Sequence, residues 1–189
     1  MKTFSLPTLL VLPVIVLLTS CQPSVQFNDA MPPGRFDLPN IPRAFRGEIV
    51  DDDEIWRIGK DTIDMGDEVL VNGEDFVLRR MAGHLLMSQP VPETGHWEVM
   101  VIKRDGDQFR MGQFEDDEEV LKRMAILMET EPEPMKSGGK PGYRYVLVSP
   151  TAKEFRAVLK EGLYELEDDG IPLPRGGRVM PPPPPPPTN

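Results

Sequence analysis

The distribution of proline constrains the fold of this chain more than any other feature. The 189 residues include 22 prolines, which are concentrated towards the two ends. Proline has no amide donor and disfavours helix at the residue before it, so proline-rich segments resist incorporation into helices and central strands. We therefore expect one folded domain in residues 47–169. It would lie between an extended tether, residues 21–46, and a disordered tail, residues 170–189.

The predicted tether sets the reach of the domain. Its prolines stand at Pro23, Pro32, Pro33, Pro39 and Pro42, with single apolar residues scattered between them. Extended backbone spans roughly 3 Å per residue, so this segment would place the domain up to about 75 Å from its point of attachment.

Two dipeptides typical of tight turns divide the first half of the expected domain. Asn72-Gly73 lies between the apolar segments 69–71 and 76–78, and this pattern predicts a β-hairpin with a two-residue loop. Asp105-Gly106 lies between segments 97–104 and 108–114 and predicts a second hairpin of the same kind.

The second hairpin makes a specific prediction about the faces of the sheet. A two-residue loop at Asp105-Gly106 would pair three sets of residues across the strands: Ile102 with Phe109, Met100 with Met111, and Trp97 with Phe114. Both faces of the sheet would then carry apolar side chains. We therefore expect helices on one face and another element partly covering the other.

Helical periodicity appears after the second hairpin. One face of a predicted helix carries the apolar residues Val120, Leu121, Met124, Leu127 and Met128. The acidic residues 116–119 would occupy its first turn, where the helix dipole favours negative charge. Pro132 and Pro134 would end it.

A strand and a second helix complete the predicted domain. Residues 143–148 are typical of a strand. Thr151 and Glu154 form a capping-box pattern, which opens a helix whose buried face would carry Phe155, Val158, Leu159 and Leu163. The predicted fold class is α+β, with a mainly antiparallel sheet built from hairpins and two amphipathic helices. The C-terminal half has the order hairpin, helix, strand, helix.

The segment 76–88 fits two structures. Its apolar residues would line one face of a helix, but Gly83 would then stand inside that helix. The turn at Asn72-Gly73 also implies that a strand follows. We favour two strands joined by a turn near Gly83.

Charge and motifs exclude several classes of function. The net charge of −10 argues against nucleic acid as a partner, because phosphate binding needs a basic face. No Gly-x-Ser-x-Gly motif is present, and Gly139-Lys140 is followed by Pro141 rather than by the serine or threonine of a phosphate-binding loop. We therefore predict no catalytic and no cofactor-binding residues.

Metal binding is not supported by the spacing of the possible ligands. His84 and His96 are the only histidines, whereas zinc needs three or four ligands. The acidic runs 51–54 and 115–119 lack the alternate spacing of a calcium loop. We interpret the two histidines as ordinary strand-end residues and the acidic runs as solvated surface, and we predict no metal site.

The N-terminus has the proportions of a secretory signal peptide, residues 1–20. A short polar start with Lys2 precedes the 13-residue apolar run Leu6–Leu18, which is too short to span a bilayer. The next residues, Thr19-Ser20-Cys21, complete a motif with Leu18 that resembles the lipobox of bacterial lipoprotein precursors.

The resemblance to lipoprotein precursors covers residues 1–21 and implies a membrane anchor. Cleavage before Cys21 would make it the first mature residue, modified with diacylglycerol and usually an amide-linked acyl chain such as palmitate. Gln22 follows it in place of aspartate, which resembles the default for export to the outer membrane of proteobacteria. The resemblance implies a protein of the cell envelope, facing the periplasm. Cys21 is the only cysteine, so the chain has no internal disulfide.

The C-terminal tail contains the unbroken run Pro181–Pro187. Such a run adopts polyproline II, which serves either as a docking rod for a protein partner or as a solvated spacer. Both alternatives stay open at this point.

These observations predict a lipid-anchored envelope protein with a binding or assembly role, for which an envelope protein partner docking on the tail is one of the two alternatives for that segment. Two alternatives remain. One is a metal-assisted hydrolase of envelope polymers that uses the carboxylates with His84 or His96. The other is a module that binds a small ligand on its sheet.

Overall fold

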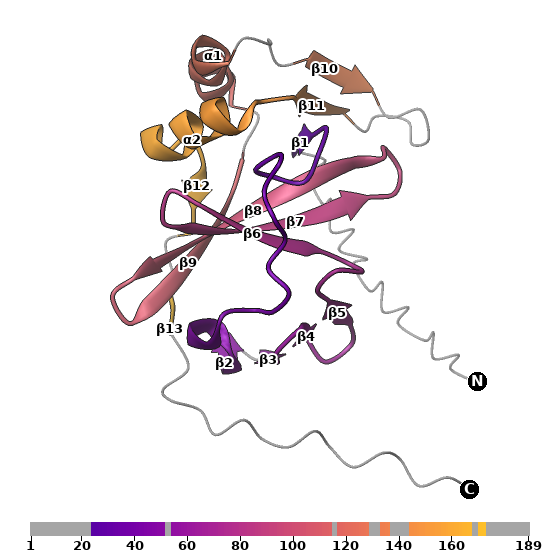
Figure 1. Ribbon diagram of the computed structural model, residues 1–189, viewed down its shortest axis with the longest axis vertical. Coiled ribbons are helices and arrows are strands. Elements are labelled where there is room, and N and C mark those ends of the chain that lie inside the picture. Colours follow the sequence, from indigo (N-terminus) through magenta and orange to yellow (C-terminus); the bar gives the residue numbers. More distant parts are fainter. Residues whose placement is uncertain are drawn as a thin grey trace, which may run out of the picture.

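The protein folds into two β-sheets and two α-helices (Figure 1). The computed structural model describes residues 24–51, 54–114, 117–128, 133–136, 144–167 and 170–172. The predicted signal peptide, Cys21 and the proline run of the tail lie outside the described residues. The fold class is α+β with a mainly antiparallel sheet, as predicted.

The larger sheet has nine strands within the described residues. Its main order is β10-β11-β1-β8-β7-β6, and β9 pairs with β8 on one side and with β12 and β13 on the other. All pairs are antiparallel except β1 with β11. The strands are β1 (Ser24–Phe27), β6 (Val77–Met81), β7 (His84–Val91), β8 (His96–Asp105), β9 (Gln108–Gln113), β10 (Glu133–Lys136), β11 (Arg144–Val148), β12 (Glu165–Leu166) and β13 (Ile171–Pro172).

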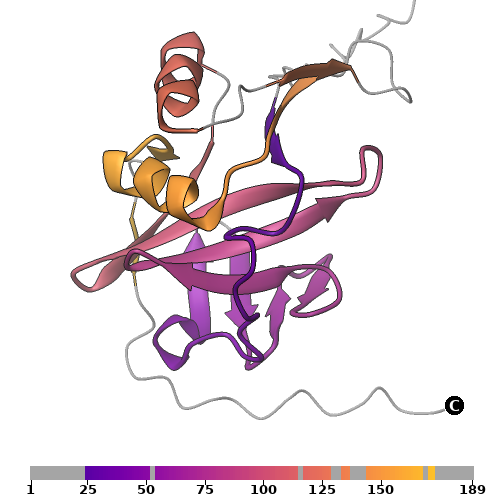
Figure 2. The ribbon, with the colours of Figure 1, turned by 45° about the horizontal axis from the view of Figure 1, so that its top comes forward.

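The smaller sheet is a four-stranded antiparallel meander, again within the described residues. Its order is β2-β3-β4-β5, and its strands are β2 (Gly47–Asp51), β3 (Glu54–Ile58), β4 (Thr62–Asp64) and β5 (Val69–Val71). Figure 2 shows it on one side of the larger sheet, with both helices on the other side. The predicted second covering element is therefore this small sheet.

Both predicted helices are confirmed. The first, α1, spans Glu118–Leu127, and Asp117 caps it by accepting hydrogen bonds from two backbone amides of the first turn. The second, α2, spans Ala152–Glu161 and begins with the predicted capping box of Thr151 and Glu154. Gly162 ends α2 in the left-handed conformation.

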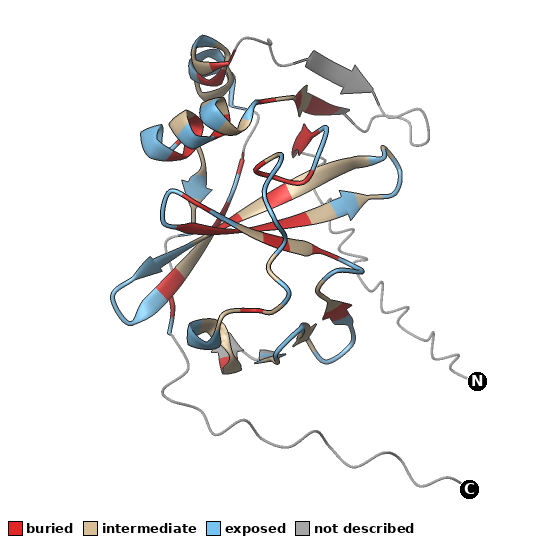
Figure 3. Cartoon of the chain, viewed as in Figure 1, coloured by how far each residue is buried: buried red, intermediate tan, exposed pale blue. Residues whose placement is uncertain are grey.

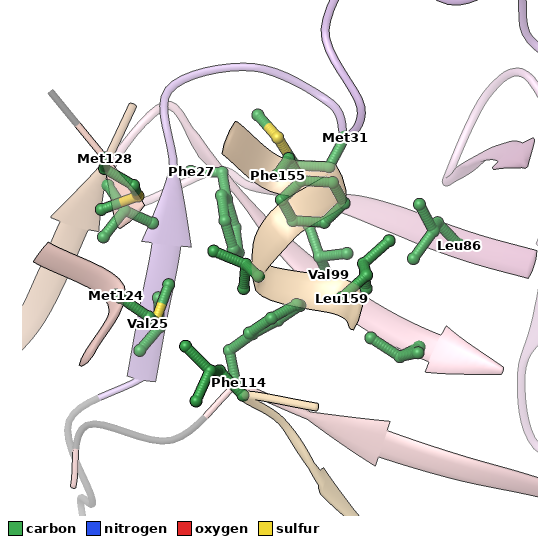
Figure 4. Close-up of a cluster of buried hydrophobic side chains, with 14 of the residues drawn as sticks. Val25, Phe27, Met31, Leu86, Val99, Phe114, Met124, Met128, Phe155 and Leu159 are labelled. Atoms are coloured by element: carbon green, nitrogen blue, oxygen red, sulfur yellow. The ribbon is translucent and has the colours of Figure 1, made fainter. Parts of the chain in front are cut away.

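The helices pack on a hydrophobic core that is centred on aromatic rings (Figure 4). Phe27 of β1 contacts Phe114 and Phe155 edge to face, with ring centroids 5.2 and 5.6 Å apart. Val99 of β8 and Leu159 of α2 lie in the same core. This core joins four parts of the chain that are distant in sequence, so it holds the large sheet and the helices together.

The preferred interpretation of the segment 76–88 is confirmed. It forms β6 and β7, which are joined by a two-residue turn at Ala82-Gly83 with Met81 opposite His84. Both turn residues have positive φ, at 52° and 85°, as a type I′ turn requires.

The register predicted for the hairpin of β8 and β9 is wrong by two residues. The turn lies at Gly106-Asp107 and not at Asp105-Gly106, so Ile102 faces Met111 and Met100 faces Gln113. The reason is the turn type. Gly106 alone has positive φ (62°), which is the pattern of a type II′ turn with glycine in its first central position. A shift of two keeps every side chain on its predicted face.

The hairpin predicted at Asn72-Gly73 is also wrong. The strand before it, β5, belongs to the small sheet, and the strand after it, β6, belongs to the large one. The Asp75 side chain accepts a hydrogen bond from the Val71 amide at 2.8 Å, and the Asn72 amide group donates to the Leu38 carbonyl at 2.8 Å. These side-chain bonds make a wider turn that carries the chain from one sheet to the other.

The tether predicted for residues 21–46 is wrong for its described part, because that part belongs to the fold. Strand β1 lies between β11 and β8, and Phe27 is fully buried. Figure 3 shows buried residues along this segment beside the large sheet. Met31 and Ile41 are also buried, each in a different hydrophobic cluster.

Hydrogen bonds fix the remainder of this N-terminal segment against the large sheet. Arg79 of β6 donates to the carbonyls of Ala30 and Pro32 and pairs with Asp37 at 2.7 Å. The Leu38 amide donates to the β6 backbone. Prolines interrupt regular structure here, but apolar residues between them are buried. The high proline content of the segment therefore led to the wrong prediction of an extended tether.

Two boundaries in the C-terminal half also differ from the predictions. The tail was expected from residue 170, but Ile171 is buried and pairs with Phe109 in β9. Strand β10 was not predicted because Pro134 lies within it. It is an edge strand of the sheet, where proline is tolerated.

Candidate functional site

The structure has a cavity of about 220 Å³ between the two sheets. The large sheet forms one wall. The small sheet, the β4–β5 turn and the segment around Ile41 and η1 (Arg43–Phe45) form the other. The lining residues are Ile41, Phe45, Trp56, Ile58, Ile63, Met65, Glu68, Leu70, Leu78, Leu85, Met87, Gln89, Met100, Ile102, Phe109 and Met111.

Strand alternation explains why the large sheet offers an apolar wall. Successive side chains of a strand point to opposite faces. In β8, Val99 and Val101 pack in the core under the helices, whereas Met100 and Ile102 face the cavity. The two longest strands, β7 and β8, carry apolar residues on both faces, so the sheet contributes to two hydrophobic interiors.

Aromatic side chains close one part of the cavity. Phe45 of η1 and Phe109 of β9 meet edge to face, with ring centroids 5.7 Å apart. Trp56 of β3 also lines the cavity. The other tryptophan, Trp97, packs against the core under the helices, so only Trp56 reports directly on this space.

Methionines make the lining adaptable. Met65, Met87, Met100 and Met111 come from four different segments of the chain and all contact the cavity. Methionine is unbranched and polarisable, so it adjusts to apolar groups of irregular shape. Such a lining suits a flexible apolar molecule.

The described residues of the lining include two polar ones, Glu68 and Gln89. Glu68 follows the β4–β5 turn and is exposed, so it lies where the cavity meets solvent. Gln89 is half-buried on β7 and stands opposite Glu98 in β8. The Gln26 amide group donates to the Glu98 carboxylate at 3.4 Å.

The two histidines are not brought together. His84 begins β7 and His96 is paired with its last residue, so they lie at opposite ends of that strand. Nε2 of His84 is hydrogen-bonded to the Tyr164 hydroxyl at 2.7 Å. Burial lowers the pKa of His84 and raises the pKa of Tyr164, so both groups are neutral near pH 7.

The acidic runs do not form a ligand cluster in the described part of the chain. In the backbone register of β2 and β3, Asp51 stands opposite Glu54, and Asp117 caps α1. Among the described residues, no three His, Cys, Asp or Glu residues lie close enough to hold a metal ion.

Neither helix in the described part of the chain is long and apolar enough to span a bilayer. Comparison with known proteins found no matching family model, no matching curated protein and no matching solved structure. The site must therefore be interpreted from its own geometry and chemistry.

The sequence predicted no cavity, but it placed four of the lining residues, Met100, Ile102, Phe109 and Met111, on one face of a sheet. It also led us to expect another element partly covering one face. It missed the residues from the small sheet and from Ile41, because nothing local indicates that these segments fold onto the hairpin. The available signal was that the predicted hairpin carries apolar residues on both faces of the sheet, which indicates that a second element must cover one of them.

Proposed function

We propose that this protein binds a small apolar molecule between its two sheets and is held at the bacterial envelope by lipid on Cys21. The observation that carries the binding function is the cavity of about 220 Å³ with a mostly apolar lining. This is the ligand-binding alternative among the functions expected from the sequence.

The size and the lining of the cavity are sufficient for binding. An apolar cavity of about 150 Å³ binds benzene in another protein. Each methylene transferred from water contributes about 0.8 kcal/mol, so a short alkyl chain would gain several kcal/mol on entering the cavity. The exposed position of Glu68 supports a route from solvent into the cavity.

The proposed lipid anchor would place the cavity close to a source of apolar ligands. Only residues 22 and 23 lie between Cys21 and the first residue of β1. A spacer this short extends less than about 15 Å. A lipidated domain would therefore lie at the bilayer surface, where apolar molecules are concentrated, and not tens of ångströms away.

Filling the cavity is expected to abolish binding of an uncharged probe. Ile63 lies on β4 and lines the cavity, so Ile63→Phe introduces a ring into the space that a ligand would occupy. We expect octanol affinity to fall at least about tenfold, the equivalent of roughly 1.4 kcal/mol. Trp56 fluorescence in a Trp97→Phe background is the measurement.

The matched control is Ile55→Phe, because Ile55 lies in the same small sheet but is exposed and does not line the cavity. It should retain the parent affinity. In the parent, each methylene added to the alcohol should strengthen binding about fourfold. Equal losses in both variants, or no saturable binding of any alcohol to the parent, would contradict the proposed binding function.

Replacing Cys21 with serine is expected to remove the lipid, because serine has no thiol to form the thioether. In cells of a proteobacterial host fed an alkyne analogue of palmitate, the parent should incorporate the label and Cys21→Ser should not. Gln22→Asn is the control and should keep the label. Labelling of Cys21→Ser at the parent level would contradict the anchor.

A further inference from the structure

We infer that the ligand is a single-chain amphiphile with a positively charged head, whose chain lies in the cavity and whose head lies beside Glu68. This inference rests on the proposed function and adds the chemical class of the ligand. It depends on the charges around the opening of the cavity.

Among the described residues that line the cavity, Glu68 alone is charged. Its backbone carbonyl accepts a hydrogen bond from the Met65 amide at 2.9 Å, which closes the β4–β5 turn. Asp67 precedes it and is exposed, and Asp64 lies at the start of the same turn. Glu68 therefore places one carboxylate at the opening, on a short, hydrogen-bonded turn, whereas Asp64 follows the lining residue Ile63 on β4 and faces away from the cavity.

The arginine that contacts this turn is already paired. Arg57 lies 3.6 Å from Asp64 and 3.3 Å from Glu48, so two carboxylates share its charge. Asp64 also accepts a hydrogen bond from the Gly66 amide at 2.9 Å. Glu68 has no corresponding ion pair within the described residues.

This arrangement discriminates between head groups. No lysine or arginine stands among the described lining residues, so an anionic carboxylate head would meet Glu68 without a cation from these residues to offset the repulsion. An ammonium head would instead pair with the Glu68 carboxylate at the solvent boundary. Specificity would come from both the attraction and the repulsion.

The second polar lining residue fits the same class of ligand. Gln89 offers an amide oxygen, and the register places the carboxylate-bearing Glu98 opposite it. The amide oxygen of Gln89 can accept a hydrogen bond from an ammonium head, but its NH2 group can equally donate to a carboxylate, so the discrimination between head groups comes from Glu68. The cavity volume limits the apolar part to a short chain.

Three probes with the same alkyl chain test the inference: octylammonium, octanol and octanoate. Their affinities for the full chain are measured at pH 7 by Trp56 fluorescence in the Trp97→Phe background. We expect octylammonium to bind at least about tenfold more tightly than octanoate, with octanol between them. Glu68→Gln should bring the two charged probes close to equal affinity, and Glu68→Lys should reverse their order.

The matched control is Glu119→Gln, which removes the same charge from the first turn of α1 on the other side of the large sheet. It should leave the order and spacing of the three affinities unchanged. Binding of octanoate as tightly as octylammonium, or an unchanged preference in Glu68→Gln, would overturn the head-group inference and leave the apolar cavity standing. Failure of all three probes to bind would instead overturn the proposed function.

Discussion

Replacing Phe27 with alanine is expected to lower the free energy of unfolding by about 3–5 kcal/mol. Phe27 is fully buried, and its ring contacts Phe114 and Phe155 at the centre of the core under the helices. Loss of the ring removes its burial and leaves a cavity between the large sheet and α2. A domain of this size has a total stability of only about 5–15 kcal/mol, so the effect should be obvious.

Urea denaturation followed by circular dichroism measures this change. The control is Phe36→Ala, because Phe36 lies in the same N-terminal segment but is 97% exposed. We expect the control to change stability by less than about 0.5 kcal/mol. Equal stability of Phe27→Ala and the parent would show that residues 24–27 are a tether and not a strand of the sheet.

Gly112→Ala is expected to destabilise the protein by about 1–3 kcal/mol, although alanine is the smallest possible addition. A Cβ atom at this position of β9 would lie 2.1 Å from the Glu165 carbonyl oxygen and 2.9 Å from a Leu166 methyl carbon. The obstacle is largely backbone, so β12 must move away from β9. Glycine is required here because another backbone approaches closely.

Thermal and urea unfolding compare this variant with Gln113→Ala, which changes the next residue of β9. Gln113 is exposed, so its replacement should alter stability by less than about 0.5 kcal/mol. A Gly112→Ala protein as stable as the parent would mean that β12 does not pack against β9 at this distance.

Local signals were sufficient for the elements whose stability is local. The helix α2 is predicted by a capping box and a repeating apolar face, both of which lie within a dozen residues. The same holds for the turn near Gly83, because glycine adopts positive φ without steric cost, although Ala82 beside it also has positive φ. The two-residue error in register at Asp105-Gly106 arose because a glycine fits either the second central position of a type I′ turn or the first central position of a type II′ turn. The choice between these positions depends on pairing along whole strands.

The pairing of distant segments was not available from local signals. Asn72-Gly73 has the form of a hairpin turn, yet the strands on its two sides join different sheets. Strand β1 has few residues and follows a proline, but it pairs with β11 and contacts β8. In both cases the outcome depends on which apolar faces remain to be covered after the hairpins have formed.

The sequence by itself determined the α+β class, the two helices with their caps, and a sheet with two apolar faces. These features follow from hydrophobic periodicity and helix capping, which are set by residues close together in the sequence. The tertiary structure decided that residues 24–46 complete the fold, that a separate small sheet covers the second face, and that a cavity remains between the sheets. The physical reason is that hydrophobic burial has no directional preference, so it specifies that a face must be covered but not which segment covers it.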